Sequence, residues 1–145
     1  MIAVDTNILV YSVRADSPWH DLALDSIRSL AEGRVLWAIA WPCIHEFLAI
    51  VTSPKIYKPP TPLSDAMLQV DYWMESPVLR LLGEEPGYWE HLKALLSTAK
   101  AAGAVVHDAR VAAICRSCGV QEIWTADRDF LRFGSLPARN PLTTQ

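Results

Sequence analysis

Short stretches with the composition of buried strands alternate along this chain with longer stretches of helical periodicity. The clearest strand-like stretch is Ile2-Ala3-Val4, and a helical pattern follows it at once. A chain that alternates in this way folds into an α/β domain with a mostly parallel central sheet. We predict strands at 2–4, 35–39, 78–82, 104–106 and 123–125, a last edge strand at 140–142, and helices at 7–13, 17–32, 42–52, 62–75, 88–101, 108–118 and 129–133.

The length of the chain, 145 residues, is close to the commonest domain size, so we expect residues 1–145 to form a single domain. Hydrophobic residues make up 51% of it, which excludes an intrinsically disordered protein. No apolar stretch reaches the roughly 18 residues of a membrane span, and the N-terminus lacks the basic region of a secretion signal. We therefore expect a cytoplasmic protein that does not bind a membrane.

The cysteines number three, and an odd count argues against a disulfide framework and fits a reducing compartment. Cys115 and Cys118 have the spacing of a redox motif or of half a zinc site. They lie, however, on a predicted helix with no second cysteine pair nearby. We interpret both as small apolar residues of the core.

The formal net charge of -3 argues against a strongly basic surface for nucleic acid. A local group of bases can still meet phosphate while acids gathered elsewhere make the total negative. The candidates for such a group are Arg14, Lys55, Lys58, Arg110, Arg128 and Arg132.

Four acidic residues stand at the edge of apolar segments or inside them, namely Asp5, Glu46, Asp108 and Asp127. Two carboxylates about 4 Å apart repel by about 4 kcal/mol at an effective dielectric constant of about 20. Several acids therefore converge in ionised form only with a metal ion or basic partners. If the fold brings these four together, the oxygen-seeking ions Mg²⁺ and Mn²⁺ are the natural candidates.

The positions of Asp5, Asp108 and Asp127 are predicted to follow the carboxyl ends of parallel strands, where open α/β sheets bind ligands. Each one alone also fits a simpler role as a helix N-cap, whose oxygen accepts free backbone N–H groups. Three such residues at one edge of the sheet, with a fourth acid on a helix, favour a common site.

Glu46 lies on a predicted helix that is apolar on nearly every side, so we expect it to be buried. A buried glutamate needs a metal ion or a basic partner, and the metal site is the favoured interpretation. The adjacent His45, and His107 beside Asp108, point elsewhere on their helices, and we treat both as core or supporting residues.

The order of the motifs resembles a known family. They are Val4-Asp5-Thr6-Asn7, a glutamate on an early helix, Asp108-Ala109 opening an alanine-rich helix, Thr125-x-Asp127-x-Asp129-Phe130, and a closing Asn140-Pro141-Leu142. Over its whole length the chain is similar to a PIN-domain ribonuclease, and more narrowly to the VapC-type toxins of bacterial toxin-antitoxin pairs.

This resemblance implies a three-layer α/β/α sandwich and an acidic pocket that binds one or two Mg²⁺ or Mn²⁺ ions. It also implies an RNA substrate that is single-stranded or looped, such as tRNA or rRNA, together with a cognate antitoxin and a homodimer. By matching positions, the metal-site acids are Asp5, Glu46, Asp108 and Asp127, with Asp129 as a fifth, and Thr6, Asn7 and Thr125 are the polar residues that orient them.

A metal ion at such a site activates water and neutralises charge on the scissile phosphate, so the predicted function is endoribonuclease cleavage. We predict RNA contacts at Arg14, Lys55, Tyr57 and Lys58. The equal alternative is that these residues are ordinary solvated surface.

Two other functions remain open from the residues, a PIN-like RNA-processing nuclease without an antitoxin and a non-catalytic scaffold that binds RNA or protein. A phosphatase of the aspartyl-phosphate type fits less well, because Asp5 is followed by Thr6-Asn7 and no lysine follows a late strand. The six tryptophans, including Trp19, Trp37, Trp73 and Trp89, exceed what so small a core needs and hint at a protein interface.

Overall fold

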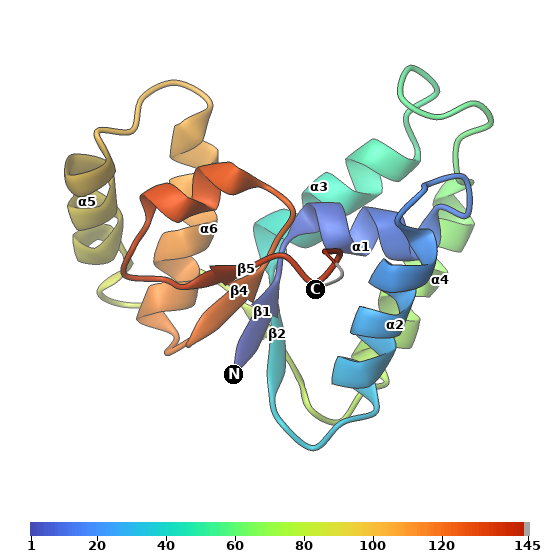
Figure 1. The fold of residues 1–145 in the computed structure, drawn as a ribbon, viewed down its shortest axis with the longest axis horizontal. Helices are drawn as coiled ribbons and strands as arrows, with labels where there is room; N and C mark the ends of the chain where they lie inside the picture. Colours follow the sequence, from blue (N-terminus) through green and yellow to red (C-terminus); the bar gives the residue numbers. More distant parts are fainter. Residues whose placement is uncertain (144–145) are drawn as a thin grey trace.

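The structure is a computed structural model and describes residues 1–143. Strands and helices alternate along the chain as the sequence predicts (Figure 1). The elements are β1 (Ile2–Val4), α1 (Thr6–Val13), α2 (His20–Ala31), β2 (Trp37–Ala40), α3 (Trp41–Val51), α4 (Leu63–Met74), β3 (Leu79–Leu82), α5 (Tyr88–Ala99), α6 (Val105–Ser117), β4 (Glu122–Trp124), the 3₁₀ helix η1 (Arg128–Arg132) and β5 (Ala138–Arg139).

The sheet has the strand order β3-β2-β1-β4-β5, and each described pair of neighbours is parallel. In its centre Ala3 pairs with Ala38 on one side and with Ile123 on the other. Helices α5 and α6 lie on one side of the sheet and α1 and α2 on the other (Figure 1). The predicted α/β fold with a mostly parallel sheet is confirmed.

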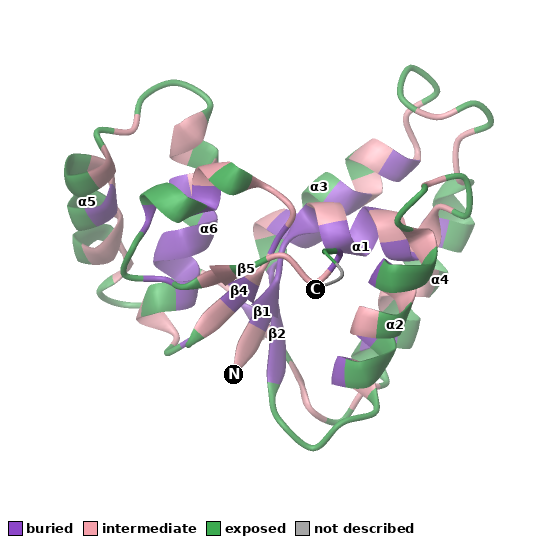
Figure 2. Ribbon diagram, in the orientation of Figure 1, coloured by how far each residue is buried: buried purple, intermediate pink, exposed green. Residues whose placement is uncertain are grey.

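The core is centred on β2, where every residue is buried (Figure 2). Trp37 and Phe47 are among the largest fully buried side chains, and Phe47 packs edge-on against Trp73 at 4.8 Å between ring centroids. The indole N–H of Trp37 donates to Ser76 Oγ at 3.1 Å, so its burial leaves no polar group unpaired. Two of the tryptophans that hinted at an interface, Trp37 and Trp73, therefore belong to the core.

Two predicted strands are wrong. Residues 104–106 are not a strand, because the chain turns at Gly103 (φ +65°) and α6 begins at Val105. The two β-branched residues, Val105 and Val106, are tolerated there because the alanine-rich remainder of the segment favours a helix. Residues 140–142 form a turn instead, in which Asn140 Oδ1 accepts a bond from the Leu142 N–H at 2.9 Å. The edge strand is Ala138–Arg139.

Within residues 1–143, no helix combines the length and the apolar character needed to cross a membrane.

Candidate active site

Asp5 is the buried centre of the candidate site. It directly follows β1, caps the N-terminus of α1 and is only 7% exposed. Its Oδ1 accepts from the Thr6 N–H at 2.8 Å, and its Oδ2 accepts from the Thr125 hydroxyl at 2.8 Å. Burial raises the pKa of Asp5 to about 6, against the opposing effect of the bonds from Thr125 and Thr6. The negative charges of Glu46 and Asp127 raise that pKa further.

A hydrogen-bond network ties the segment after β1 to the segment after β4. The Asn7 amide donates to Thr125 Oγ1 at 3.2 Å and to Asp5 Oδ2 at 3.3 Å, while Asn7 Oδ1 accepts from the Ala126 N–H at 3.0 Å. Thr125 Oγ1 also accepts from the Asp127 N–H at 3.0 Å. The predicted orienting residues thus join Asp5 to the loop that carries Asp127.

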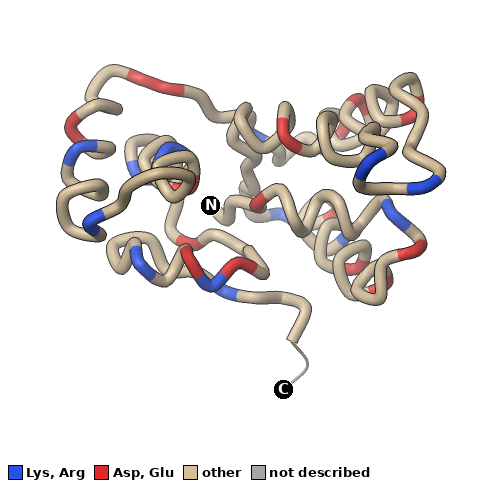
Figure 3. Tube along the Cα trace, turned by 90° about the horizontal axis from the view of Figure 1, so that it is seen from above, with Lys and Arg blue, Asp and Glu red and all other residues tan. Residues whose placement is uncertain are grey.

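Three more acids form a tight group beside this network. Asp108, Asp127 and Asp129 each offer a carboxylate oxygen within 4.8 Å of the others. Asp127 caps η1 and accepts from the Asp129 N–H at 2.9 Å. Seen from above, acidic positions from separate segments lie around the middle of the molecule (Figure 3). We call Asp108, Asp127 and Asp129 the acidic triad.

Asp108 reaches the triad from the first turn of α6, and not from the end of a strand as predicted. Partial burial raises its pKa to about 6, and the charges of Asp127, Asp5, Asp129 and Glu46 raise it further, in that order. All five predicted acids therefore share one electrostatic environment. Asp5 and Glu46 adjoin the triad but lie outside its tight grouping.

The prediction that Glu46 is buried is wrong, because its side chain is exposed. Its Oε2 accepts from the Thr6 hydroxyl at 3.1 Å, which places it beside Asp5. Helix α3 starts immediately after β2, at the carboxyl end of that strand, and its Glu46 lies within hydrogen-bond reach of the residue that follows Asp5. His45 and His107 are exposed as well, and neither is a core residue.

The buried thiol of Cys43 was not predicted to belong to the site. Its Sγ lies 3.7 Å from Asp5 Oδ1, and burial raises its pKa well above the usual value. The sequence gives one weak signal, since Cys43 precedes Glu46 by three residues on the same helix. Of the predicted core pair, Cys115 is buried and has its pKa raised to about 12 by burial, whereas Cys118 is half-buried.

Arg14, a predicted RNA contact, is engaged within the chain. Its guanidinium makes two bonds to Asp16, at 3.0 and 2.7 Å, and donates to the carbonyl of Pro59 at 3.0 Å and to Thr61 Oγ1 at 3.2 Å. It also stacks over the Tyr57 ring at 4.2 Å, and its side chain is only 12% exposed. Arg14 and Tyr57 thus hold the loop between α3 and α4, which projects from the body of the molecule (Figure 1). On this loop Lys55 and Lys58 are exposed.

The triad fits a divalent cation by the chemistry of its donors. Three carboxylates lie within 4.8 Å of one another. Among the described residues, the basic side chain that forms an ion pair with them is Arg132, which lies 3.8 Å from Asp129, and both side chains of that pair are half-exposed. Such a pair is weakly stabilising and leaves the repulsion between the acids largely uncompensated. Carboxylate oxygens are the ligands that Mg²⁺ and Mn²⁺ favour, so an ion of this class would relieve the repulsion.

Comparisons with known proteins agree with this fold. The PIN-domain family matches residues 2–136. Ribonuclease VapC48 of Mycobacterium tuberculosis is 30% identical over 139 residues, 96% of each chain. Ribonuclease VapC33 of the same organism is 30% identical over 145 residues, which cover 98% of this chain and 99% of the relative.

Solved structures share the fold at lower identity. VapBC2 of Rickettsia felis, bound to a DNA fragment from its promoter, has a TM-score of 0.70 at 17% identity, covering 97% of this chain and 98% of that one. VapC20 of Mycobacterium tuberculosis, a toxin that cleaves the sarcin-ricin loop, has a TM-score of 0.65 at 19% identity, covering 94% and 99%. The chain belongs to the PIN-domain family. Its relatives of similar length include VapC ribonucleases.

Proposed function

We propose that this protein is a metal-dependent endoribonuclease, the toxin of a type II toxin-antitoxin pair, and that it cuts single-stranded or looped RNA. The observation that carries the proposal is the acidic triad, with oxygens within 4.8 Å of one another and with Asp5 and Glu46 beside it. The VapC ribonucleases among its relatives support the RNA substrate. Bases of an A-form duplex are poorly accessible to side chains, which favours unpaired RNA.

In this proposal Asp108, Asp127 and Asp129 hold Mg²⁺ or Mn²⁺, with Asp5 and Glu46 completing the negative environment. The bound ion would supply positive charge against the scissile phosphate and ease deprotonation of the attacking water. Asp5 acts mainly by position, because its hydrogen bond from Thr125 fixes the loop that presents Asp127.

Glu46 has the role of orienting the attacking water and accepting its proton. Its carboxylate is exposed, and the Thr6 hydroxyl holds Oε2 at 3.1 Å beside Asp5. As the water oxygen bonds to phosphorus and gives its proton to Glu46, the bond from phosphorus to the leaving oxygen breaks, and that oxygen takes up a proton from solvent water. Glu46 is thus the general base of the proposed hydrolysis.

The proposed partners are a cognate antitoxin that covers the acidic site and a second copy of the chain. Several solved neighbours are VapBC complexes, in which a toxin is paired with its antitoxin. Helix α4 also exposes a group of apolar side chains that suits a protein partner, namely Leu63, Met67, Leu68, Tyr72 and Met74.

The proposed activity is tested by incubating the purified protein with a mixed pool of structured cellular RNAs and Mg²⁺ or Mn²⁺. We expect cleavage that EDTA and Asp5→Asn abolish. The matched control Asp21→Asn, on the exposed first turn of α2, should cleave like the wild type. Failure to cleave in every metal-containing sample would contradict the nuclease, and cleavage that survives EDTA would contradict its need for metal.

A further inference from the structure

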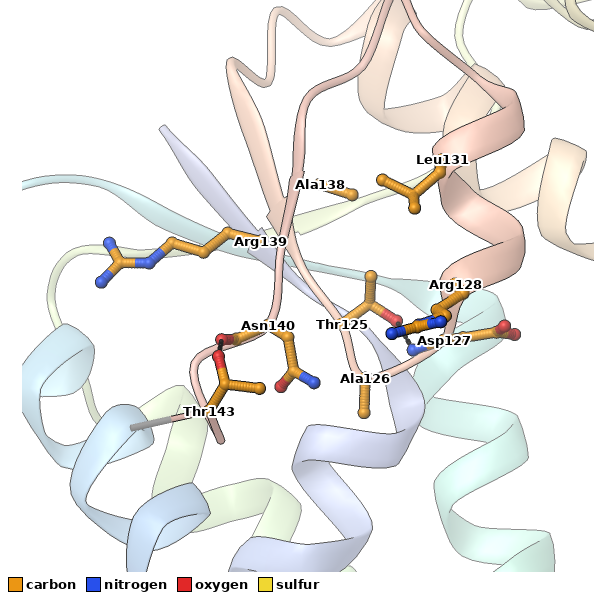
Figure 4. Close-up of a pocket in the computed structure, with 9 residues that line it drawn as sticks. All are labelled: Thr125, Ala126, Asp127, Arg128, Leu131, Ala138, Arg139, Asn140 and Thr143. Carbon is orange, nitrogen blue, oxygen red and sulfur yellow. Dashed lines mark hydrogen bonds between the residues drawn. The ribbon is translucent and has the colours of Figure 1, made fainter. Parts of the chain in front are cut away.

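Two hollows adjoin on the far side of the loop that carries Asp127. The first, of about 220 Å³, lies between η1 and the segment from Ala138 to Thr143 (Figure 4). The second, of about 240 Å³, is lined by Tyr11 and Trp19. Both include Ala126, Asn140 and Thr143, so they form one continuous depression beside the acidic site.

The first hollow presents positive charge. Arg128 and Arg139 line it, and Arg139 lies over the Trp124 ring at 5.6 Å. Arg128 is exposed, and within residues 1–143 no hydrogen bond or ion pair occupies its guanidinium. The Asp127 carboxylate points away from Asn140 and Arg139, on the other side of the loop (Figure 4). The guanidinium of Arg128 is therefore available to an anion such as phosphate.

The second hollow presents an aromatic surface. Trp19 is 45% exposed although it packs against Tyr11, with ring centroids 5.0 Å apart. Its backbone N–H donates to Ser17 Oγ at 3.1 Å, which helps to fix the start of α2. A tryptophan that is held in place and half-exposed offers a surface on which an unpaired base can stack.

Asn140 stands where the two hollows meet. Its Oδ1 accepts from the Leu142 N–H at 2.9 Å, and this bond fixes the orientation of the carboxamide. In the described part of the chain its Nδ2 group has no acceptor, so two N–H donors are available there. A donor of this kind pairs with an oxygen or ring nitrogen at the edge of a base.

We propose that this depression binds one unpaired nucleotide of the RNA substrate next to the scissile phosphate. Arg128 contacts a phosphate, the base stacks on Trp19, and Asn140 donates to the edge of the base. The inference rests on the proposed ribonuclease function and adds to it the residues that grip the RNA outside the acidic site.

The test is binding of single-stranded RNA in EDTA, where no cleavage is needed. The probes are fluorescein-labelled homopolymers of U, C or A, about eight nucleotides long. Arg128→Ala and Trp19→Leu should each weaken binding about tenfold. Arg128→Ala should also reduce the slope of the logarithm of affinity against the logarithm of salt concentration by the amount that about one phosphate contact contributes.

Matched control variants separate this subsite from general surface effects. Arg34→Ala changes an exposed arginine at the opposite edge of the sheet, and Trp89→Leu changes a 56% exposed tryptophan on α5. Both should bind RNA like the wild type. If Arg128→Ala binds like the wild type, or if Arg34→Ala weakens binding equally, the subsite is wrong. Melting temperatures of all four variants show whether Trp19→Leu acts only by unfolding α2. If it does, the result with Arg128→Ala decides whether the subsite exists.

Asn140→Asp keeps the oxygen that accepts from Leu142 and removes the two donors. It should abolish the preference of the wild type among the three homopolymers, and an unchanged preference would overturn the role of Asn140. If these variants bind RNA more weakly but the wild type cleaves no RNA in the presence of metal, the subsite is supported and the proposed ribonuclease function is contradicted. If the wild type cleaves RNA while Arg128→Ala and Trp19→Leu bind RNA normally, the ribonuclease function is supported and the subsite is contradicted.

Discussion

The hydroxyl of Thr125 donates a 2.8 Å hydrogen bond to Asp5 Oδ2, across 120 residues of sequence. The same oxygen of Thr125 accepts from Asn7 and from the Asp127 N–H. One side chain that is 3% exposed thus joins the end of β1 to the end of β4 and positions two of the site acids. Its loss affects stability and the proposed catalysis together.

Thr125→Val removes this hydroxyl without changing the volume much. Because the Asn7 amide and the Asp127 N–H lose a buried acceptor, we expect the free energy of unfolding to fall by about 1–3 kcal/mol. Thr125→Ser keeps the hydroxyl and should lose less than half of that. Urea unfolding of both variants measures the difference, and equal losses would mean that the methyl group matters and the hydrogen bonds do not.

Asp5→Asn should change how the stability of the metal-free protein depends on pH. Burial raises the pKa of Asp5 to about 6 in the folded state, above its usual 3.8, so the folded state binds the proton more tightly. Protonated Asp5 therefore contributes its full share to the stability below about pH 4, and this share is lost as the pH rises through about 6. The total loss in the free energy of unfolding is at most about 3 kcal/mol. The stability of Asp5→Asn relative to that of the wild type should therefore rise between about pH 4 and pH 7.

Urea unfolding in EDTA across that pH range measures the gain. A difference in stability between Asp5→Asn and the wild type that stays constant from about pH 4 to pH 7 would contradict the raised pKa of Asp5.

Arg14→Ala should loosen the loop between α3 and α4. The guanidinium makes two bonds to Asp16 and bonds to Pro59 and Thr61, so its loss leaves the loop without its main contacts to α1. We expect a loss of about 1–2 kcal/mol of stability and faster proteolysis within the loop. Lys55→Ala, at an exposed position of the same loop, is the control. If Arg14→Ala leaves proteolysis unchanged and weakens RNA binding alone, Arg14 is a substrate contact after all.

Mn²⁺ affinity should fall with pH below about 6. The pKa of Asp108 is raised to about 6 by partial burial and by its acidic neighbours, and a protonated carboxyl is a poor ligand. We expect about a tenfold loss of affinity per pH unit for each proton displaced. Calorimetric titrations at about pH 5, 6 and 7 measure this loss, and an affinity that is equal at all three values would show that the raised pKa does not control binding.

The sequence predicts those parts of the site that depend on local structure. Asp5 and Asp127 come after strands and cap the next helix, and both features are visible in the order of residues alone. The sequence predicts that Asp108 follows a strand at 104–106, whereas α6 already begins at Val105. Periodicity does not separate a short strand from the first turn of a helix.

The features that the sequence misses depend on how distant segments meet. The sequence of α3 is apolar on most sides, but whether Glu46 is exposed depends on which other segments pack against that helix, and Glu46 is exposed. The bonds from Arg14 to Pro59 and Thr61 span more than 40 residues and leave no local pattern. The depression between Arg128, Asn140 and Trp19 likewise combines three separate segments.

Calorimetric titration of Mn²⁺ into Asp108→Asn and into the wild type at neutral pH is the most direct test of the acidic triad as a metal site. Asp21→Asn, which removes the same charge from the exposed start of α2, is the control. We predict that the wild type and Asp21→Asn bind Mn²⁺ alike, and that Asp108→Asn loses at least tenfold in affinity because one oxygen donor and one charge are gone. Equal binding by all three proteins, or no binding by the wild type, would contradict the account.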